Sequence, residues 1–175
     1  AQHGGQGRRP GVIDPRPPGA RRQADTPVLF DLSPTISARL QVWPGDTPPA
    51  REVLLDMHRG DHLTLSTLRT TVHTGAHADA PSHYGRDAPA IEAADLGVYV
   101  GECVVLRIPA RPSDRIDAAA LPAGLSAERV LIATGTYPDP ERFETRFAAL
   151  APALVDWLAD RGTRLIGVDT PSVDL

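Results

Sequence analysis

The chain of 175 residues contains neither lysine nor asparagine, and all 18 of its basic residues are arginine. The absence of lysine excludes Schiff-base chemistry and a lysine general base, because both need a side-chain amine. The net charge of −4 gives no reason to expect nucleic acid as a partner. No apolar run approaches the ~18 residues that a membrane span needs, so we expect no membrane contact either.

Cysteine occurs once, as Cys103. A single cysteine excludes an intrachain disulfide and a CxxC metal site, which fits a reducing compartment and a cytoplasmic location. Cys103 begins the apolar run 103–108, so we expect a small buried core residue rather than a nucleophile. The glycine-rich nucleotide motifs GxGxxG and GxxxxGK[ST] and the GxSxG nucleophile elbow are also missing, which argues against nucleotide-binding and serine hydrolase folds.

Hydrophobic content of 41% and charged content of 23% are typical of a folded soluble protein. Residues 1–27 are rich in arginine, glycine and proline and have almost no apolar side chains, so we expect a disordered tail. A basic arm for an acidic partner is the alternative interpretation of the same segment. The remaining residues, 28–175, are enough for one domain with a hydrophobic core.

Strands predominate in this domain. Runs of apolar and β-branched residues predict strands at 28–32, 53–57, 63–72, 102–108, 129–133 and 164–169. The clearest helix is 152–161, with proline in its first turn and Gly162 after its end, and a shorter helix is expected at 117–121. The pattern predicts an α/β or α+β domain built around one mixed sheet or barrel.

Residues 73–83 read HTGAHADAPSH and place His73, His77, Asp79 and His83 at offsets of 0, 4, 6 and 10. A helix would separate these side chains, and Gly75 argues against one. Every even offset points the same way on an extended chain, so a strand running into a loop could aim all four into one pocket. Imidazole and carboxylate are the groups that a divalent metal such as zinc recruits.

The ligand types indicate a catalytic centre. His73, His77 and Asp79 would supply three ligands and leave a position open for water, as catalytic zinc sites do. His83 is either a fourth ligand or a general acid and base beside the site. Trp43, which lies between turn-forming residues, is either a loop-packing residue or one wall of a ligand pocket.

Residues 73–83 resemble the HxGTHxDxPxH signature of the cyclase family of metal-dependent hydrolases, which includes the bacterial kynurenine formamidases. One position departs, because Ala76 stands where the signature has threonine. Segments 31–34, 42–48 and 165–174 also resemble members of that family, in the same order. The resemblance covers about residues 28–174.

The resemblance implies a swivelling β/β/α fold and a homodimer or larger homo-oligomer. It implies that His73, His77 and Asp79 bind one divalent metal, zinc or manganese, and that Asp79 is shared with a second ion. His83 would then be the proton donor and acceptor, and Trp43 would contact a small aromatic formamide. The implied reaction is hydrolysis of N-formyl-L-kynurenine to L-kynurenine and formate, a step of tryptophan degradation.

The family places a further histidine and glutamate ligand downstream of segment 165–174, whereas this sequence ends at Leu175. We therefore expect an incomplete second metal site and the absence of the C-terminal elements of the fold. Two alternatives stay open: a related amidohydrolase resembling isatin hydrolase, and a truncated, inactive protein that binds metal.

Overall fold

The computed structural model describes residues 28–175 and divides the chain into two units at the junction of Leu32 and Ser33. The expected tail, 1–27, lies outside the described residues. The strand predicted at 28–32 is wrong: these residues form no strand, and the Leu29 side chain is 94% exposed. Apolar composition favours a strand only where another strand pairs with it and a core covers one face.

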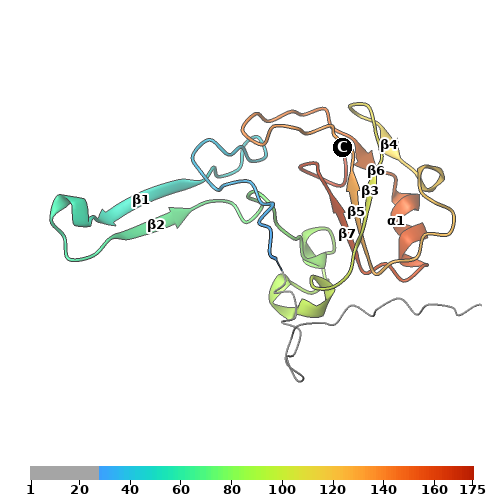
Figure 1. Cartoon of the computed structure of the whole chain (residues 1–175), viewed down its shortest axis with the longest axis horizontal. Coiled ribbons are helices and arrows are strands. Elements are labelled where there is room, and N and C mark those ends of the chain that lie inside the picture. Colours follow the sequence, from blue (N-terminus) through green and yellow to red (C-terminus); the bar gives the residue numbers. More distant parts are fainter. Residues whose placement is uncertain (1–27) are drawn as a thin grey trace, which may run out of the picture. The chain divides into compact units, whose positions relative to one another are not determined.

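The centre of the second unit is a parallel sheet with the strand order β3-β5-β7 (Figure 1). Its strands are β3 (Val104–Arg107), β5 (Arg129–Ala133) and β7 (Leu165–Val168). Val130 of β5 lies opposite Val104 on one side and Ile166 on the other. The three strands therefore lie inside the ranges that their apolar runs predict.

Two smaller pairs complete the strands. An antiparallel hairpin joins β1 (Ala50–Leu55) to β2 (Leu65–Arg69), and a short parallel pair joins β4 (Arg115–Ile116) to β6 (Ala149–Leu150). Residues 28–175 thus contain three separate sheets rather than the single mixed sheet or barrel expected from sequence. A closed barrel needs all its strands hydrogen-bonded in one ring, whereas the strands of residues 28–175 fall into three sheets of which the largest has three strands.

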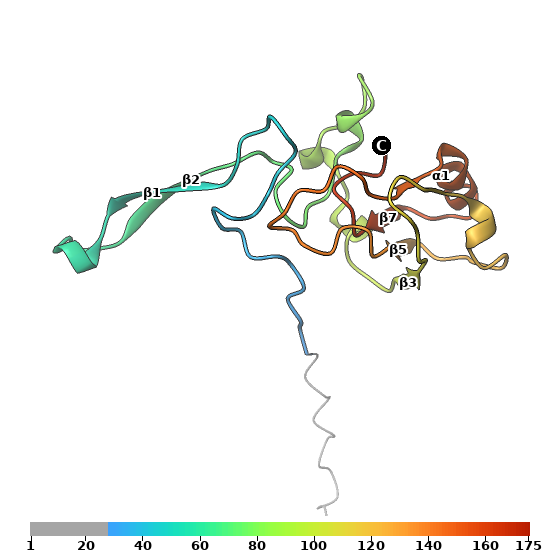
Figure 2. The same cartoon turned by 90° about the horizontal axis from the view of Figure 1, so that it is seen from above.

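The hydrophobic core lies between the central sheet and helix α1 (Pro152–Ala159), which follows β6 and leads into β7. Leu154 and Leu158 of the helix are fully buried, together with Val130 and Ile132 of β5. Both views place α1 against one side of β3, β5 and β7 (Figure 2). The helical spacing of the two leucines explains this packing.

Short 3-10 helices occupy much of the rest. They are η1 (Met57–Arg59), η2 (Pro81–His83), η3 (Ile91–Ala93), η4 (Leu96–Val98) and η5 (Ala118–Ala120). The helix predicted at 117–121 is the single turn η5. No helix among residues 28–175 is both long and apolar enough to cross a membrane.

The expectation that Cys103 is buried in the core is wrong, because its side chain is exposed. It comes directly before β3 and therefore outside the part of the run that enters the sheet. The thiol is free.

Candidate metal centre

The loop that follows β2 carries the histidine cluster, and buried threonines fix its start. Thr74 is buried and its hydroxyl donates to the Thr71 carbonyl at 2.9 Å. The backbone N–H of His73 donates to the Thr71 hydroxyl at 3.2 Å. Gly75 then takes a left-handed conformation with φ of 61°, which a residue without a Cβ adopts at little cost. These contacts turn the chain back on itself directly after His73.

Three atoms that could each coordinate a metal ion lie close together inside this loop. Nδ1 of His73 lies 2.8 Å from Oδ1 of Asp79, and Nε2 of His77 lies 3.3 Å from the same oxygen. The two imidazole nitrogens are 3.2 Å apart. The loop has no strand over these residues, so the side chains converge through a turn rather than through the alternation of an extended chain.

The hydrogen bonds of His77 decide which of its nitrogens is free. Its Nδ1 lies 2.9 Å from the Gly75 carbonyl oxygen, which can only accept, so Nδ1 carries the proton. Nε2 therefore presents its lone pair towards His73 and Asp79. Metal-binding histidines commonly donate their second N–H to a backbone carbonyl in this way, which fixes the ring.

The spacing of the three atoms fits a divalent cation. Ligands at about 2.0–2.2 Å from a tetrahedral zinc ion lie roughly 3.3 Å from one another. The observed separations of 2.8, 3.2 and 3.3 Å are close to that value. Two nitrogens and one carboxylate oxygen are also a donor set that zinc and manganese accept. The chain thus offers three preformed donors for one ion.

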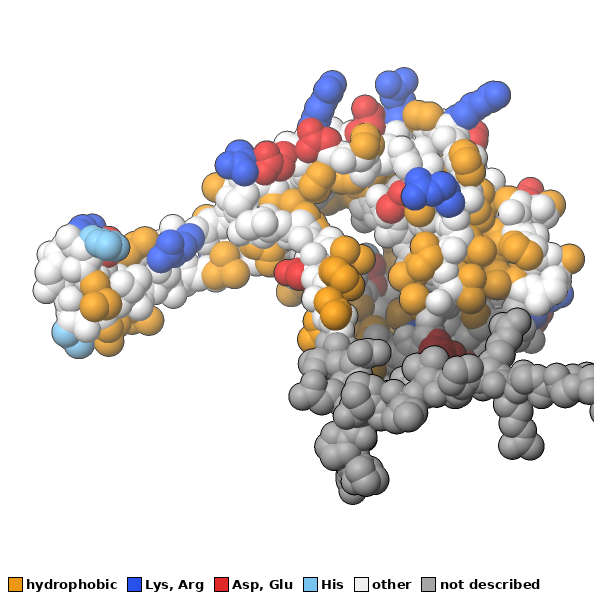
Figure 3. All heavy atoms as spheres, in the orientation of Figure 1, with side chains coloured by type: hydrophobic (Ala, Val, Ile, Leu, Met, Phe, Trp, Pro, Cys, Tyr) orange, Lys and Arg blue, Asp and Glu red, His pale blue; other side chains and the backbone are white. Residues whose placement is uncertain are grey.

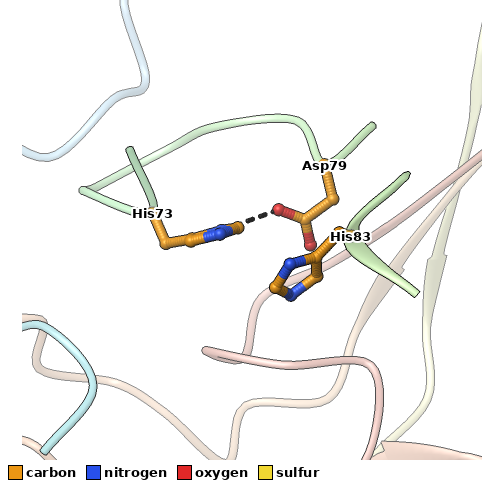
Figure 4. Close-up of side chains that lie close together, drawn as sticks. All are labelled: His73, Asp79 and His83. Atoms are coloured by element: carbon orange, nitrogen blue, oxygen red, sulfur yellow. Dashed lines mark ion pairs between the residues drawn. The ribbon is translucent and has the colours of Figure 1, made fainter. Parts of the chain in front are cut away.

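His83 belongs to a second, overlapping group. One ligand atom from each of His73, Asp79 and His83 lies within 4.8 Å of the others (Figure 4). The 3-10 turn η2 carries His83, and its ring is 4.3 Å from the ring of His73 between centroids. His73 and Asp79 are common to both groups. The distances are compatible with either role expected of His83.

Asp46, to which the sequence assigned no role, lies next to the same loop. Hydrogen bonds from the Thr71 side chain and from the Thr47 N–H hold the pKa of Asp46 below its ordinary value, and the nearby His73 acts in the same direction. The Thr71 N–H also donates to the Thr47 carbonyl at 2.9 Å. The sequence could have pointed to Asp46, because this residue lies in the segment 42–48 that resembles members of the cyclase family.

Trp43 precedes this contact by three residues and is 49% exposed. Its ring packs edge-on against Phe143 at 5.6 Å and against Phe147 at 6.3 Å between centroids. Both interpretations of Trp43 therefore apply in part, because the ring packs on the loop 135–147 while about half of the residue is exposed. Sequence patterns gave no indication of the phenylalanines, which lie about 100 residues away.

The other histidines outside residues 1–27 do not join the cluster. His58 and His62 are exposed near the turn of the hairpin, as expected of solvated residues. His3 falls outside the described residues.

Comparison with known protein families identifies the family to which the chain belongs. Residues 30–175 match the Cyclase family, whose description reads "Putative cyclase". The chain belongs to the Cyclase family. The match covers both structural segments of the site, the Trp43 loop and residues 73–83.

Solved structures agree with this assignment. A protein described as a "potential metal-dependent hydrolase with cyclase activity" shares 24% identity, with a TM-score of 0.68 over 83% of this chain and 69% of the other. A "predicted metal-dependent hydrolase" from Bacillus stearothermophilus shares 26% identity, with a TM-score of 0.65 over 83% and 70%. A "novel cyclase" at 16% identity has a TM-score of 0.63 over 83% and 65%. The mixed α/β fold is therefore that of Cyclase-family structures.

Proposed function

We propose that this Cyclase-family chain is a metal-dependent hydrolase that cleaves N-formyl-L-kynurenine to L-kynurenine and formate. The observation that carries the proposal is the convergence of His73, His77 and Asp79, whose donor atoms lie 2.8–3.3 Å apart. Two similar structures are described as metal-dependent hydrolases, which supports the reaction class. The specific substrate rests on the resemblance of segments 42–48 and 73–83 to kynurenine formamidases.

The loop would hold the cation through His73, His77 and Asp79. A divalent ion there supplies a Lewis acid for the formyl carbonyl and a water molecule whose pKa falls to roughly 7. Zinc and manganese both accept this donor set. The Gly75 carbonyl keeps the His77 ring in the binding tautomer before the ion arrives.

His83 is placed to move the proton that the reaction requires. An arylamide nitrogen must gain a proton before it leaves, since the anilide anion is a strong base. An imidazole ring has one nitrogen that can donate a proton and one that can accept it, so it can serve both halves of the reaction. His83 follows the loop on η2 and stays within 4.8 Å of the donor atoms of His73 and Asp79. Trp43 is about half exposed, and its aromatic surface is the part of the site that we assign to the substrate ring.

The test is direct. The protein is loaded with Zn²⁺ or Mn²⁺, incubated with N-formyl-L-kynurenine, and monitored for the absorbance of kynurenine. We expect turnover that depends on the ion and disappears in Asp79→Ala. His58→Ala is the matched control, because it removes a histidine from the hairpin turn and should leave activity unchanged.

Two other outcomes identify the alternatives. Turnover of isatin or other cyclic and aryl amides, with none of N-formylkynurenine, would indicate a hydrolase related to isatin hydrolase. Binding of metal without turnover of any amide would indicate an inactive metal-binding protein. Either result contradicts the proposed reaction.

Assembly as a homodimer or larger homo-oligomer and a cytoplasmic location both stay proposals that follow from the resemblance and from the single cysteine. Sedimentation of the purified protein over a range of concentrations measures the first. A mass equal to one chain at every concentration would contradict it.

A further inference from the structure

Half of the aromatic residues of this chain gather at one place, apart from the core cluster around β5 and α1. The sequence has two tryptophans, three tyrosines and three phenylalanines. Trp43 contacts Phe143 and Phe147, and Tyr137 contacts Phe143 at 5.9 Å between centroids. All these pairs are edge-to-face, with interplanar angles of 71–83°. The four rings are absent from the core cluster of residues that surrounds β5 and α1.

The cluster has a buried base and an open face. Phe147 is 1% exposed, whereas Trp43 is 49% exposed and Tyr137 and Phe143 are half-buried. On the face of the molecule shown in Figure 3, apolar side chains (orange) reach the surface. Rings that only stabilised the fold would gain most from full burial, because the hydrophobic contribution grows with the area removed from water. Three partly open rings on one base are better explained by a surface for a ligand.

Polar contacts hold the two segments of the cluster together. The Arg39 Nε lies 2.8 and 2.9 Å from the two carboxylate oxygens of Glu141. The Gln41 N–H donates to the Pro140 carbonyl at 3.0 Å. The chain leading to Trp43 is therefore fixed against the loop that carries Tyr137 and Phe143.

A second set of contacts joins this cluster to the metal loop. The Asp46 N–H donates to the Trp43 carbonyl at 2.9 Å and closes a tight turn. Thr47 then accepts from Thr71, and the Thr71 hydroxyl accepts from the His73 N–H. One turn and two hydrogen bonds thus separate the Trp43 backbone from the first proposed ligand.

We propose that Tyr137 and Phe143 extend Trp43 into an aromatic wall that determines selectivity for aryl amides over alkyl amides. This inference rests on the proposed hydrolase function and adds two specificity-determining residues to it. A planar aryl group beside the metal loop would pack against the exposed parts of these rings, whereas an alkyl group of similar length would cover less of them. The Tyr137 phenol is an O–H donor at neutral pH and can donate to a polar group on the aryl ring. Burial, together with the charge of Asp139, raises its pKa.

The first experiment compares kcat/KM for formanilide and for N-methylformamide. Phe143→Leu keeps the apolar volume and removes the aromatic face. We expect it to lower kcat/KM for formanilide about three- to tenfold and to leave N-methylformamide within twofold. Tyr99→Leu, which removes an aromatic ring outside the wall, is the matched control and should leave the ratio unchanged. If Phe143→Leu is active and its ratio of kcat/KM for formanilide to kcat/KM for N-methylformamide equals that of the wild type, the proposed aromatic wall is wrong.

The second experiment measures binding without turnover. In Trp157→Phe, Trp43 is the one remaining tryptophan, so its fluorescence reports ligands at the wall. We expect formanilide to quench this fluorescence, with weaker affinity after Phe143→Leu or Tyr137→Ala. Zn²⁺ titration and circular dichroism of each variant check that the fold and the metal loop persist.

The two experiments separate this inference from the proposed function. Quenching that Phe143→Leu weakens, in a protein that hydrolyses no amide, would support the wall and contradict the hydrolase. Turnover of aryl amides together with equal quenching in all variants would support the hydrolase and contradict the wall.

Discussion

His77 and His83 differ in what surrounds their imidazole rings, and that difference predicts different mutants. His77 has its Nδ1 proton engaged by the Gly75 carbonyl and its Nε2 3.2–3.3 Å from two other donors. His83 reaches the same group from η2, with its ring tilted by 42° against His73 and edge-to-face with Tyr84. We expect His77→Ala to abolish metal binding, and His83→Ala to keep the metal but to lower kcat by about 100-fold or more.

Metal analysis after dialysis, together with single-turnover assays, checks this pair. The expected stoichiometry is one ion per chain in the wild type and in His83→Ala. Loss of the ion from His83→Ala would assign it as a ligand instead of a proton carrier. Retention of the ion by His77→Ala would show that the donor set is drawn from the other group, which is formed by His73, Asp79 and His83.

Asp169, which follows β7, accepts hydrogen bonds from the residues that follow β5. From these bonds we predict that the stability of the fold depends on pH. Burial alone would raise the pKa of Asp169, but hydrogen bonds from Gly135 and Thr134 outweigh it and the pKa falls below its ordinary value of 3.8. Oδ1 accepts from the Thr134 N–H and hydroxyl at 2.9 and 2.8 Å, and Oδ2 accepts from the Gly135 N–H at 2.8 Å. Because the folded state holds the ionised form, this group stabilises the fold above pH ~4 and loses that contribution as pH falls through its lowered pKa.

Asp169→Asn should therefore cost about 1–2 kcal/mol of unfolding free energy at pH 7, since the amide places a donor against a donor. The gap between wild type and variant should shrink in acid. Urea unfolding at pH 7 and at pH 3 measures both values. Asp156→Asn, an exposed change on α1, is the control and should cost almost nothing. An equal difference in unfolding free energy between wild type and Asp169→Asn at the two pH values would contradict a stabilising role for the ionised Asp169 carboxylate.

At the scale of elements, the hairpin of β1 and β2 differs from the central sheet in burial. Leu54, Leu65 and Leu68 are 47–58% exposed, whereas Val130 and Ile132 of β5 are at most 1% exposed. A two-stranded hairpin is marginally stable by itself in water. We expect its amide hydrogens to exchange at least ten times faster than those of β5, because opening it exposes little further apolar surface.

Hydrogen–deuterium exchange followed by mass spectrometry, with peptides covering 50–69 and 129–133, tests this difference. Equal protection of the two regions in a dilute sample would show that something covers the hairpin in solution. The same measurement at higher protein concentration would then report on association of chains.

The accuracy of sequence prediction also varied among the elements, for physical reasons. Segment 130–133 is a continuous apolar run, and it forms most of β5 because apolar strands pair with it on both sides of the sheet. Segment 28–32 is just as apolar, yet it forms no strand, because local composition does not specify a pairing partner. The ligands at 73–83 could be identified from spacing, but their convergence depends on Gly75 and the buried threonines rather than on an extended strand.

Contacts between segments that are far apart in the chain could not be predicted from the sequence. The approach of Trp43 to Phe143 depends on how the loop 135–147 leaves β5, and no local pattern encodes that path. The same is true of Asp169 and Thr134, which are 35 residues apart and meet because β5 and β7 are neighbours in a parallel sheet. Adjacent carboxyl ends of parallel strands are the physical reason that such a clamp forms at this edge.

For the whole molecule, the metal loop makes folding and ion binding interdependent. The three donors lie within seven residues, but Asp46 and Thr71 tie their loop to the segment that carries Trp43. An ion that binds only the folded arrangement stabilises it by about 2.7 kcal/mol at a free concentration 100 times its Kd. For a chain of this length that corresponds to a rise in Tm of about 5–10 °C.

Thermal unfolding with increasing Zn²⁺ should show that rise in the wild type and in His58→Ala, and should not show it in Asp79→Ala. Mg²⁺ at the same concentration is a further control, since it prefers oxygen ligands in an octahedral shell and gains little from two imidazoles. An equal shift in Asp79→Ala would place the stabilising ion elsewhere on the chain. A shift confined to chains with an intact loop would mean that the bound ion stabilises the fold through His73, His77 and Asp79, whose side chains are about one-third exposed without it.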